Sequence, residues 1–554
     1  MRWVLADPDA ASVGRLICDL GICEATAKVL VNRGVTVPEV ARGYLSEPMN
    51  LLNDPYLFSG MEKAVDRIKR AVVRGEPILI YGDYDADGIT GSALLYLFLK
   101  EMGAEVEVFI PDRFRHGYGL TREALRDLGG NGFRLLVTVD CGITSVVEVA
   151  SLVGSGIDVI ITDHHTPGAL IPDALAVINP KLDAGYPFKD LAGVGVAMKL
   201  VEALAQEFGG SQLRRAVLKR FLPLVALGTV ADVVPLIGEN RFFVKYGLRL
   251  MGEHTGIRAL MEAAGIKDRQ LVPWDVSFIL APRINAPGRM STALKSFRLL
   301  ITEDEAEAES LAMELSRENS ARQREEERVV NEALDRYRDL GVRLAFIWGE
   351  GWHPGVIGIA ASKVARRLAM PAILVSFFDS DRVGRGSGRS YGGVDLYGVV
   401  SRASSCMISF GGHRQAVGFS VERERLEEVV ALLVDAMSGV RVEEDLLKVD
   451  AVLELEDLEV GFLRELLQLA PFGEGFEEPL FMFRNLRVRF PKEMSNGGLM
   501  FEVVKGKLAV DVVSFDPISL SSGDVIDMVA SVELSEWRGK KRLRLRCKDA
   551  GRSQ

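Results

Sequence analysis

Short apolar runs that end in glycine and aspartate alternate with helical segments over the first half of the chain. From residue 78 the sequence reads ILIYGDYDADGITGSALLYLFLKEMG, an apolar strand, a turn rich in Gly and Asp, and an apolar helix. The pattern recurs as LLVTVDCGITSVVEVASLVGSG from Leu135 and as IDVIITDHH from Ile157. Strands alternating with helices predict a doubly wound, largely parallel sheet. We place this α/β domain at residues 50–300, after an N-terminal segment at 1–49.

The second half of the chain predicts a long helix and two smaller domains. Residues 303–338 lack Gly and Pro and are rich in strong helix formers, which predicts one helix within a connecting segment at 301–338. Strand and helix then alternate again and predict a smaller α/β domain at 339–440. From 448 to 554, short strands separated by turns predict a terminal β-barrel.

Composition narrows the class of protein. A chain of 554 residues with 48% hydrophobic and 26% charged residues is expected to be folded and modular. No apolar run reaches the roughly 20 residues that cross a membrane, and a signal peptide is not recognisable, so we expect a cytoplasmic protein. Five cysteines without a CxxC pair predict free thiols. Because the net charge is -10, nucleic-acid binding would depend on local basic surfaces.

Carboxylates and histidines follow three of the predicted strands, at the strand ends where open α/β sheets bind their ligands. The candidates are Asp83, Asp85 and Asp87 after the first strand, Asp140 after the second, Asp163, His164 and His165 after the third, and Asp232 in GTVADVVPL. A single aspartate after a strand is more often a turn or helix cap. So many converging carboxylates, however, would repel one another unless cations neutralised them.

The donor types indicate which metal and which reaction to expect. Oxygen ligands alone suit Mg²⁺, and an added imidazole moves the preference toward Mn²⁺. Two such cations about 3.5 to 4 Å apart favour in-line displacement at phosphorus. The sequence therefore predicts phosphodiester hydrolysis with two divalent ions, Mn²⁺ or Mg²⁺.

The motifs GDYDADGIT, VDCGIT, DHH and GTVADVVPL resemble those of the DHH phosphoesterase superfamily. Motifs outside this core narrow the resemblance to the RecJ family: PDRFRHGYGL, LAGVGVAMKL, APRINAPGRM, NSARQ, WHPGVIGIAASKVARR, GSGRS, GGHRQAVGF and PFGEGFEEPLF. The resemblance covers essentially the whole chain. It implies a DHH domain, a long helix, a DHHA1 domain with the GGH motif, and a C-terminal OB fold.

The resemblance also implies roles for the residues after the strands. The implied ligands are Asp83, Asp85 and Asp140 for one ion and Asp87, Asp140, His164 and Asp232 for the other, with Asp140 bridging. The implied catalytic residues are Asp85, Asp140 and His165, with His165 facing the substrate phosphate. Asp163 would orient a histidine rather than bind metal.

Polar residues in segments punctuated by Gly or Pro are the candidates for substrate binding. They are Arg113, Arg283, Arg289, His353, Ser387, Arg389 and His413. At such positions the backbone can approach a phosphate and a guanidinium can grip it with two hydrogen bonds. The alternative for each is a solvated surface residue. In RecJ-like enzymes, residues matching Arg113, Ser387 and Arg389 are implied to seat the 5′-terminal phosphate.

The stretch WRGKKRLRLRCK near the C-terminus indicates a basic barrel strand. Arg542, Arg544 and Arg546 would share one face, with leucines on the other. A basic face beside Trp537 suits single-stranded DNA, because cations bind phosphates and a ring can stack on a base. The alternative is an amphipathic strand with a merely soluble face.

The expected function is a two-metal exonuclease that hydrolyses single-stranded DNA from 5′ to 3′ into mononucleotides, in DNA repair and recombination. The resemblance implies a single-strand-binding protein and a RecQ-type helicase as partners, and we expect a monomer. One rival is a phosphodiesterase for short oligonucleotides or cyclic dinucleotides, against which the basic C-terminal module argues. Another is a non-catalytic scaffold, against which the intact ligand set argues.

Overall fold

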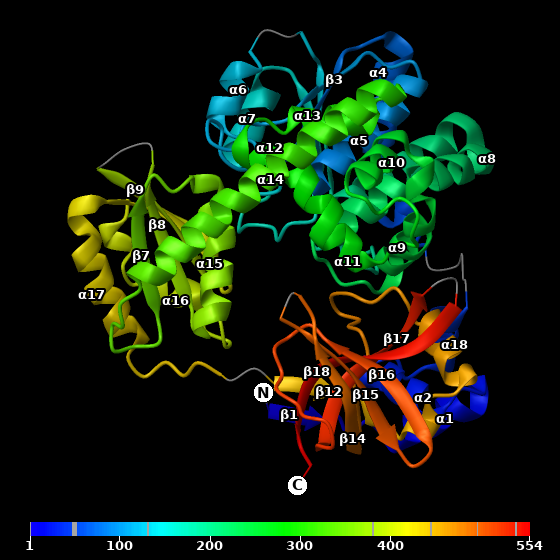
Figure 1. Ribbon diagram of the computed structural model, residues 1–554. Helices are drawn as coiled ribbons and strands as arrows, with labels where there is room; N and C mark the ends of the chain where they lie inside the picture. The colour runs from blue at the N-terminus through cyan, green and yellow to red at the C-terminus, as the bar shows by residue number, and fades with distance from the viewer. Residues whose placement is uncertain are drawn as a thin grey trace.

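The computed structural model describes residues 2–46, 52–129, 132–378, 382–443, 446–495, 497–537 and 540–553. Two α/β domains joined by a long helix lie above a β-barrel, and short N-terminal helices lie beside the barrel (Figure 1). We call the part from residue 52 to 301 the first α/β domain and the part from 345 to 437 the second. The barrel unit comprises residues 2–46 together with 446–553.

The first α/β domain contains a sheet of five parallel strands, as the alternating pattern predicts. In sheet order the strands are β3 (Val106–Phe109), β2 (Ile78–Gly82), β4 (Leu135–Val139), β5 (Asp158–Thr162) and β6 (Ala176–Ile178). Both faces of the sheet are covered. Ile78 and Ile80 belong to one core cluster, whereas Leu79 and Tyr81 belong to a second cluster on the opposite face.

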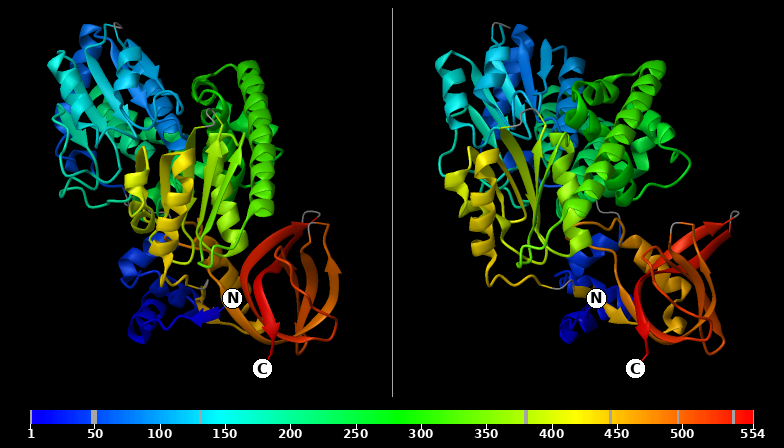
Figure 2. Two further views of the ribbon diagram at one scale, coloured as in Figure 1. Left: turned by 90° about the vertical axis from the view of Figure 1, so that its left-hand side faces the viewer. Right: turned by 60° about the vertical axis from the view of Figure 1, so that its left-hand side comes forward.

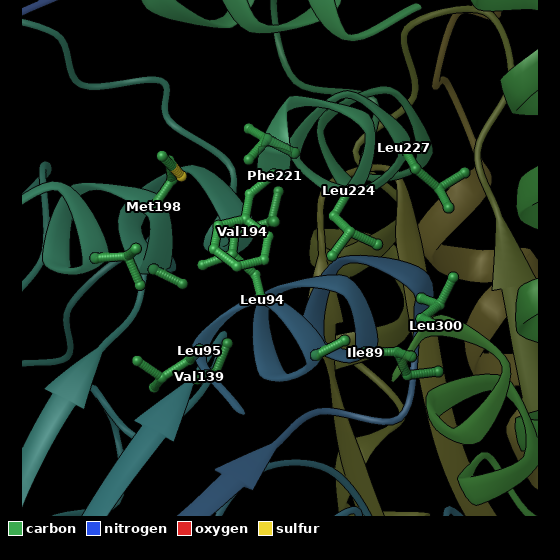
Figure 3. Close-up of a cluster of buried hydrophobic side chains, with 14 of the residues drawn as sticks. Ile89, Leu94, Leu95, Val139, Val194, Met198, Phe221, Leu224, Leu227 and Leu300 are labelled. Atoms are coloured by element: carbon green, nitrogen blue, oxygen red, sulfur yellow. The ribbon is translucent and has the colours of Figure 1, made fainter. Parts of the chain in front are cut away.

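Helices cover the sheet and then continue without further strands from residue 193 to 301, which the sequence pattern did not separate from the alternating part. Their bounds are α4 (Met61–Arg74), α5 (Ala86–Glu101), α6 (Arg122–Asp127), α7 (Val146–Gly154), α8 (Gly193–Ala231), α9 (Gly238–Leu250), α10 (Thr255–Ala263), α11 (Pro273–Asp275), the π-helical η4 (Val276–Leu280), α12 (Ala281–Met290) and α13 (Leu294–Ile301). Figure 3 shows the central packing, in which α5 carries Ile89 and Leu94 against Phe221 and Leu224 of α8.

The predicted long helix is confirmed as α14 (Glu305–Arg336). Near its start, Leu311 and Leu315 belong to the core of the first α/β domain, and near its end Val329 and Ala333 belong to a cluster of the second. Both ends are buried, and this one long helix runs between the two domains (Figure 2).

The second α/β domain has a mixed sheet of five strands in the order β10-β11-β9-β8-β7. Only β7 and β8 pair in parallel. The elements are β7 (Ala345–Glu350), α15 (Pro354–Leu368), β8 (Ala372–Phe377), β9 (Val383–Arg389), α16 (Leu396–Ser401), β10 (Ser409–His413), β11 (Ala416–Glu422) and α17 (Leu426–Met437).

The predicted terminal barrel is a closed five-stranded barrel of the OB type. Its strands follow the circular order β14-β15-β16-β18-β17, and β17 closes it by pairing with β14. The elements are β12 (Leu446–Val449), β13 (Ala451–Val452), α18 (Val460–Gln468), β14 (Phe481–Glu493), β15 (Leu499–Lys505), β16 (Leu508–Ser514), β17 (Val525–Trp537) and β18 (Lys540–Arg552).

The N-terminal segment packs with the barrel, an association that the sequence did not indicate. Its elements are β1 (Arg2–Leu5), α1 (Ala10–Leu20), α2 (Glu24–Asn32) and α3 (Pro38–Leu45). Strand β1 pairs in parallel with β12, and Leu16 and Leu30 belong to the barrel core. Arg33 forms an ion pair with Asp450 at 2.7 Å. The two ends of the chain therefore share one hydrophobic core.

One buried arginine joins the barrel unit to the first α/β domain. Arg241 of α9 donates hydrogen bonds to the carbonyl oxygens of Pro471 and Leu469. Its guanidinium also lies 4.6 Å from the ring centre of Tyr44 and 4.8 Å from that of Phe476.

Within the described part of the chain, no helix is both long and apolar enough to cross a membrane.

Replacing Leu30 with Ala should destabilise the barrel unit, because Leu30 is completely buried in the shared core. We expect the free energy of unfolding to fall by about 2–5 kcal/mol. Chemical unfolding followed by hydrogen exchange on barrel strands would measure it. The matched control is Val40→Ala on neighbouring α3, where the side chain is 52% exposed and the loss should stay within about 0.5 kcal/mol. Equal effects of the two substitutions would contradict the shared core.

Candidate metal centre and nucleic-acid interface

The carboxylates that follow the predicted strands meet at one edge of the first sheet. Strands β2, β4 and β5 are neighbours and parallel, so Asp83, Asp140 and Asp163 emerge side by side at their carboxyl ends. Asp87 is in the first turn of α5, and Asp232 directly follows the last residue of α8. The convergence expected from the sequence is therefore present in the fold.

The side chains form groups that could each hold a metal ion. The ligand atoms of Asp83, Asp85 and Asp140 lie within 4.8 Å of one another, and so do those of Asp87, His164 and Asp232. The groups adjoin, because His164 Nε2 lies 3.2 Å from Asp140 Oδ1 and 3.5 Å from Asp232 Oδ2. The first group contains the same residues as one ligand set implied by the family resemblance, and the second contains the other set except Asp140, which forms a third group with His164 and His165.

Backbone geometry fixes two of these carboxylates. Asp87 accepts hydrogen bonds from the amides of Gly193 and Val194, at 2.6 and 2.8 Å, which stand at the positive N-terminal end of α8. Asp140 adopts φ 62°, a left-handed conformation that aspartate tolerates better than most residues. At Gly193 a Cβ would lie 2.5 Å from Asp140 Oδ1, so the close approach of α8 requires glycine there.

The electrostatics of the cluster favour bound cations. Burial, reinforced by neighbouring carboxylates, raises the pKa of Asp83, Asp140 and Asp232 well above the usual range and that of Asp87 to about 7. Burial lowers the pKa of His164 to about 3, which leaves its ring neutral and able to bind metal.

Unpaired polar atoms point to the same conclusion. Asp83 Oδ1, Asp140 Oδ1 and His164 Nε2 are among the buried side-chain atoms of the described residues that have no hydrogen-bond partner. A buried polar atom without a partner is costly, and these three belong to the groups that could hold metal. Carboxylate oxygens with one imidazole suit Mn²⁺ or Mg²⁺.

Asp163 and His165 form a separate pair at the rim of the cluster. Asp163 Oδ1 lies 2.8 Å from His165 Nδ1 and accepts from the amide of His164, while Oδ2 accepts from the amide of Ile143. Although burial lowers the pKa of His165, the hydrogen bond and charge of Asp163 outweigh it and raise the pKa overall. Asp163 thus orients His165, which is itself partly exposed.

Sequence reasoning missed two polar residues at this site. Tyr118 Oη lies 2.9 Å from His165 Nε2, and Asn285 Oδ1 accepts the amide of Ala86 between the two acidic residues of the turn. Both residues lie in motifs that carry the family resemblance, PDRFRHGYGL and APRINAPGRM. Their presence in these motifs was the one signal in the sequence that could have identified them.

Four of the predicted substrate-binding residues line one cavity of about 470 Å³ between the two α/β domains. They are Arg113, Arg289, Ser387 and Arg389, and Arg385, which the sequence did not single out, lines it as well. Burial, together with the charge of Arg113, lowers the pKa of Arg389 and lowers that of Arg289 to about 10. Gathered guanidinium groups of this kind match a phosphate.

Three other candidates do not line this cavity. Arg283 donates to Ser316 Oγ of α14 and to the carbonyl oxygen of Ile279 in η4. His353 caps α15 by accepting the amide of Gly355. His413 is exposed at the end of β10. Their contacts are mainly structural or peripheral, and their roles with substrate stay predictions.

The barrel strand β18 alternates as its sequence indicates, with Leu545 buried and the arginines outward. The arginines differ, however, in their partners. Arg544 forms an ion pair with Glu533 at 2.7 Å, so its charge is largely neutralised, whereas Arg546 lies 5.2 Å from the ring centre of exposed Phe515. Arg542 is exposed. The side chain of Trp537 lies outside the described residues.

Sequence reasoning also missed most of a basic and aromatic surface on neighbouring barrel strands, of which it had named only Arg546. Lys492, Met500 and Arg546 are linked in one row by strand register through Val513. Beside this row, Phe490 is 68% exposed at a bulge with φ 51°, and Arg489 lies 4.8 Å from its ring centre. We call Arg489, Phe490, Lys492, Met500, Phe515 and Arg546 the barrel face.

A parallel sheet whose strands end in two adjoining groups of carboxylates and imidazole, beside an arginine-lined cavity, defines a metal-dependent phosphoesterase fold. Family profiles agree: the DHH family, N-terminal domain, matches residues 77–229, the DHHA1 domain 340–439 and the RecJ OB domain 449–549.

Similar proteins narrow the class. The chain is 36% identical to the single-stranded-DNA-specific exonuclease RecJ of Bacillus subtilis, covering 100% of this chain and 71% of that protein, and 34% identical to RecJ of Escherichia coli, covering 88% and 89%. The crystal structure of Thermus thermophilus RecJ with Mn²⁺ matches 100% of this chain and 80% of that one, at 31% identity and a TM-score of 0.86. The chain belongs to the RecJ family.

Replacing Asp140 with Asn should stabilise the metal-free protein, because it removes a buried carboxylate that four neighbouring carboxylates repel and because asparagine tolerates φ 62°. In EDTA at neutral pH, calorimetry should show a higher unfolding midpoint than wild type, by about 2–4 °C for each kcal/mol relieved. Added Mn²⁺ should then stabilise wild type more than the variant.

The control for this substitution is Asp183→Asn. Asp183 accepts the amides of Ser59 and Gly185, so losing its charge should not raise the midpoint. A midpoint for Asp140→Asn at or below that of wild type in EDTA would mean that the carboxylates do not repel as described.

Proposed function

We propose that this protein hydrolyses single-stranded DNA from its 5′ end into mononucleotides, with two divalent cations, Mn²⁺ or Mg²⁺. The observation that carries the proposal is the pair of adjoining ligand groups beside an arginine-lined cavity. Family membership supports the substrate, because the similar proteins are named single-stranded-DNA-specific exonucleases.

The donor set supports two ions that share one carboxylate. The proposed ligands are Asp83, Asp85 and Asp140 for one ion and Asp87, Asp140, His164 and Asp232 for the other. Bound there, two such ions activate a water and stabilise the leaving oxygen of an in-line displacement. RecJ of Thermus thermophilus has been crystallised with Mn²⁺ and with Mg²⁺, which supports either choice.

The chain's own residues would position the substrate. His165, whose pKa Asp163 raises, holds a proton on Nδ1 toward that carboxylate and leaves Nε2 to face the scissile phosphate beside Tyr118. With Asp85 and Asp140 it forms the proposed catalytic set. Because the hydrogen bonds of Asp163 are already used, it acts only by orienting His165.

Recognition of a chain end follows from the charge of the cavity. A terminal phosphate carries more negative charge than a phosphodiester, and several guanidinium groups around one cavity suit that higher charge. We assign Arg113, Arg289, Ser387 and Arg389 to the 5′-terminal phosphate, as the family resemblance implies for three of them. Seating this phosphate beside the metal centre would release one nucleotide per cleavage.

Two rival functions are weaker. A phosphodiesterase for cyclic dinucleotides would not need the barrel face with its exposed rings and cations. A non-catalytic scaffold would not need the unpaired ligand atoms of Asp83, Asp140 and His164. We further propose, from family membership, a cytoplasmic monomer that acts in DNA repair and recombination with a single-strand-binding protein and a RecQ-type helicase.

Degradation of strands labelled at either end tests the proposed reaction. With Mn²⁺ or Mg²⁺, a 5′ label should appear at once as mononucleotide, while a 3′ label should stay in progressively shorter strands. EDTA should abolish both signals, and Asp140→Ala should lower turnover by at least about 100-fold, since it removes the shared ligand. Activity in EDTA, or release of mononucleotides only from the 3′ end, would reject the proposal.

Salt dependence of binding tests the barrel face. Replacing Arg489, Lys492 and Arg546 with Ala should lower the slope of log affinity against log salt by about 2, because each phosphate contact on a single strand contributes roughly 0.7. Filter binding of a long oligonucleotide in EDTA would measure it. Arg544→Ala is the matched control and should change the slope little, because Glu533 pairs with that charge at 2.7 Å, whereas Arg489 is held less closely by Glu502, at 3.8 Å. A larger change in the control than in the triple variant would move the binding path elsewhere.

A further inference from the structure

We propose that Trp274 and Phe278 form a stacking platform for bases of the single strand on the 3′ side of the cleaved bond. This inference rests on the proposed function. The two rings are 51% and 62% exposed, and they stack on each other with centroids 5.3 Å apart and an interplanar angle of 28°. Two large aromatic side chains presented together to solvent are costly for folding alone, whereas base stacking needs that arrangement.

The platform belongs to a helical segment that leads into the metal centre. Element α11, the π-helical η4 and α12 follow one another without a break from Pro273 to Met290. Along this segment Trp274 and Phe278 are exposed and Pro282, Asn285 and Arg289 are partly exposed, while most residues between them are buried, with Ser277, Ile279 and Arg283 partly exposed as well. Beyond the π-helical turn, Pro282, Asn285 and Arg289 follow one another at three- and four-residue steps along one face of α12, and the platform precedes them in the chain.

The same face reaches the metal centre at Asn285. Asn285 Oδ1 accepts the amide of Ala86 at 2.7 Å, directly between Asp85 and Asp87. The segment is also held close to that turn, since a Cβ on Gly288 would lie 3.0 Å from the carbonyl oxygen of Tyr84. Both η4 and α12 pack against α8, the helix that ends beside Asp232.

The face ends at the cavity assigned to the terminal phosphate. Arg289 lines that cavity, and its carbonyl oxygen lies against Gly355 of the second α/β domain. The order along the helix is therefore the aromatic platform, the metal-centre turn and the phosphate cavity. A strand whose 5′ end is at Arg289 and whose first diester is at the metal centre would continue toward Phe278.

The spacing suits a few nucleotides. At 1.5 Å per helical residue, Phe278 lies about 10 Å from Asn285 and about 16 Å from Arg289 along the axis. A strand advances at least roughly 3.4 Å per nucleotide, so the platform would meet bases no more than about five nucleotides from the 5′ end. Unpaired bases can stack on an exposed ring, whereas bases in a duplex are stacked already, so the platform would favour single strands.

Substitution by leucine separates stacking from hydrophobic contact. Trp274→Leu with Phe278→Leu keeps apolar bulk but removes both aromatic faces. In EDTA we expect affinity for a 20-nucleotide strand to fall about 10- to 100-fold, as loss of base stacking implies. With Mn²⁺, hydrolysis of a 5′-phosphorylated dinucleotide should change less than about twofold, because it does not reach the platform. Leu170→Ala, at a side chain 71% exposed in a loop, is the control and should change neither.

Tryptophan fluorescence gives a readout that does not depend on activity. The chain has five tryptophans, and Trp274→Phe removes one while preserving an aromatic ring. An oligonucleotide of six or more nucleotides should quench wild-type fluorescence in EDTA, whereas the Trp274→Phe variant should lose that part of the quenching and keep most of its affinity. A dinucleotide should quench neither protein by this route.

The outcomes distinguish this inference from the function on which it rests. If the leucine variant binds and degrades long strands like wild type, the platform is rejected and the exonuclease function stands. If wild type neither binds nor degrades single strands, both are rejected. If sedimentation finds that wild type dimerises and the leucine variant does not, with equal affinity for DNA, the rings cover a second copy of this chain and the platform is again rejected.

Discussion

Mutual repulsion among buried carboxylates is the constraint on which the site depends. Three adjacent parallel strands end at one edge of the sheet, and this topology forces Asp83, Asp140 and their neighbours together. Burial raises the cost of their charges, and the amides at the start of α8 compensate only Asp87. The close contact of Gly193 with Asp140 prevents the cluster from relaxing by moving apart. Bound divalent cations would offset the negative charge that the protein itself leaves uncompensated.

The second constraint is the rigid placement of the arginine-lined cavity. Its walls come from both α/β domains, so its shape depends on the helix that joins them. Helix α14 is buried in one core through Leu315 and in another through Val329, so it connects the two walls of the cavity. Burying several arginines in one cavity is unfavourable without an anion, just as the carboxylates are unfavourable without cations. A substrate phosphate would neutralise the arginine-lined cavity, and metal ions would neutralise the carboxylate cluster.

The sequence predicted those features that depend only on residues close together in the chain. Strand ends that carry Asp83, Asp140 and Asp163 could be predicted because apolar runs stop there, and α14 because its sequence lacks Gly and Pro. Long-range contacts were not predictable in this way. Nothing local indicates that Leu16 and Leu30 share a core with a barrel more than 400 residues later, or that Glu533 lies opposite Arg544. Tyr118 and Asn285 were within recognised motifs, but only the folded structure shows which atoms they contact.

The exposed aromatic residues differ in kind from the charged groups of the cavity and the metal centre. A cavity that recognises a terminal phosphate and ions that act on a phosphodiester are both indifferent to whether the strand is paired. Surfaces that stack on unpaired bases would add selectivity for single strands, which charge alone cannot provide. Exposed rings with that property are found at Trp274 and Phe278, on the barrel face at Phe490 and Phe515, and at Tyr118 beside His165. Phe490 keeps a strained φ of 51° at its bulge, and strain of this kind persists where the surrounding structure imposes it.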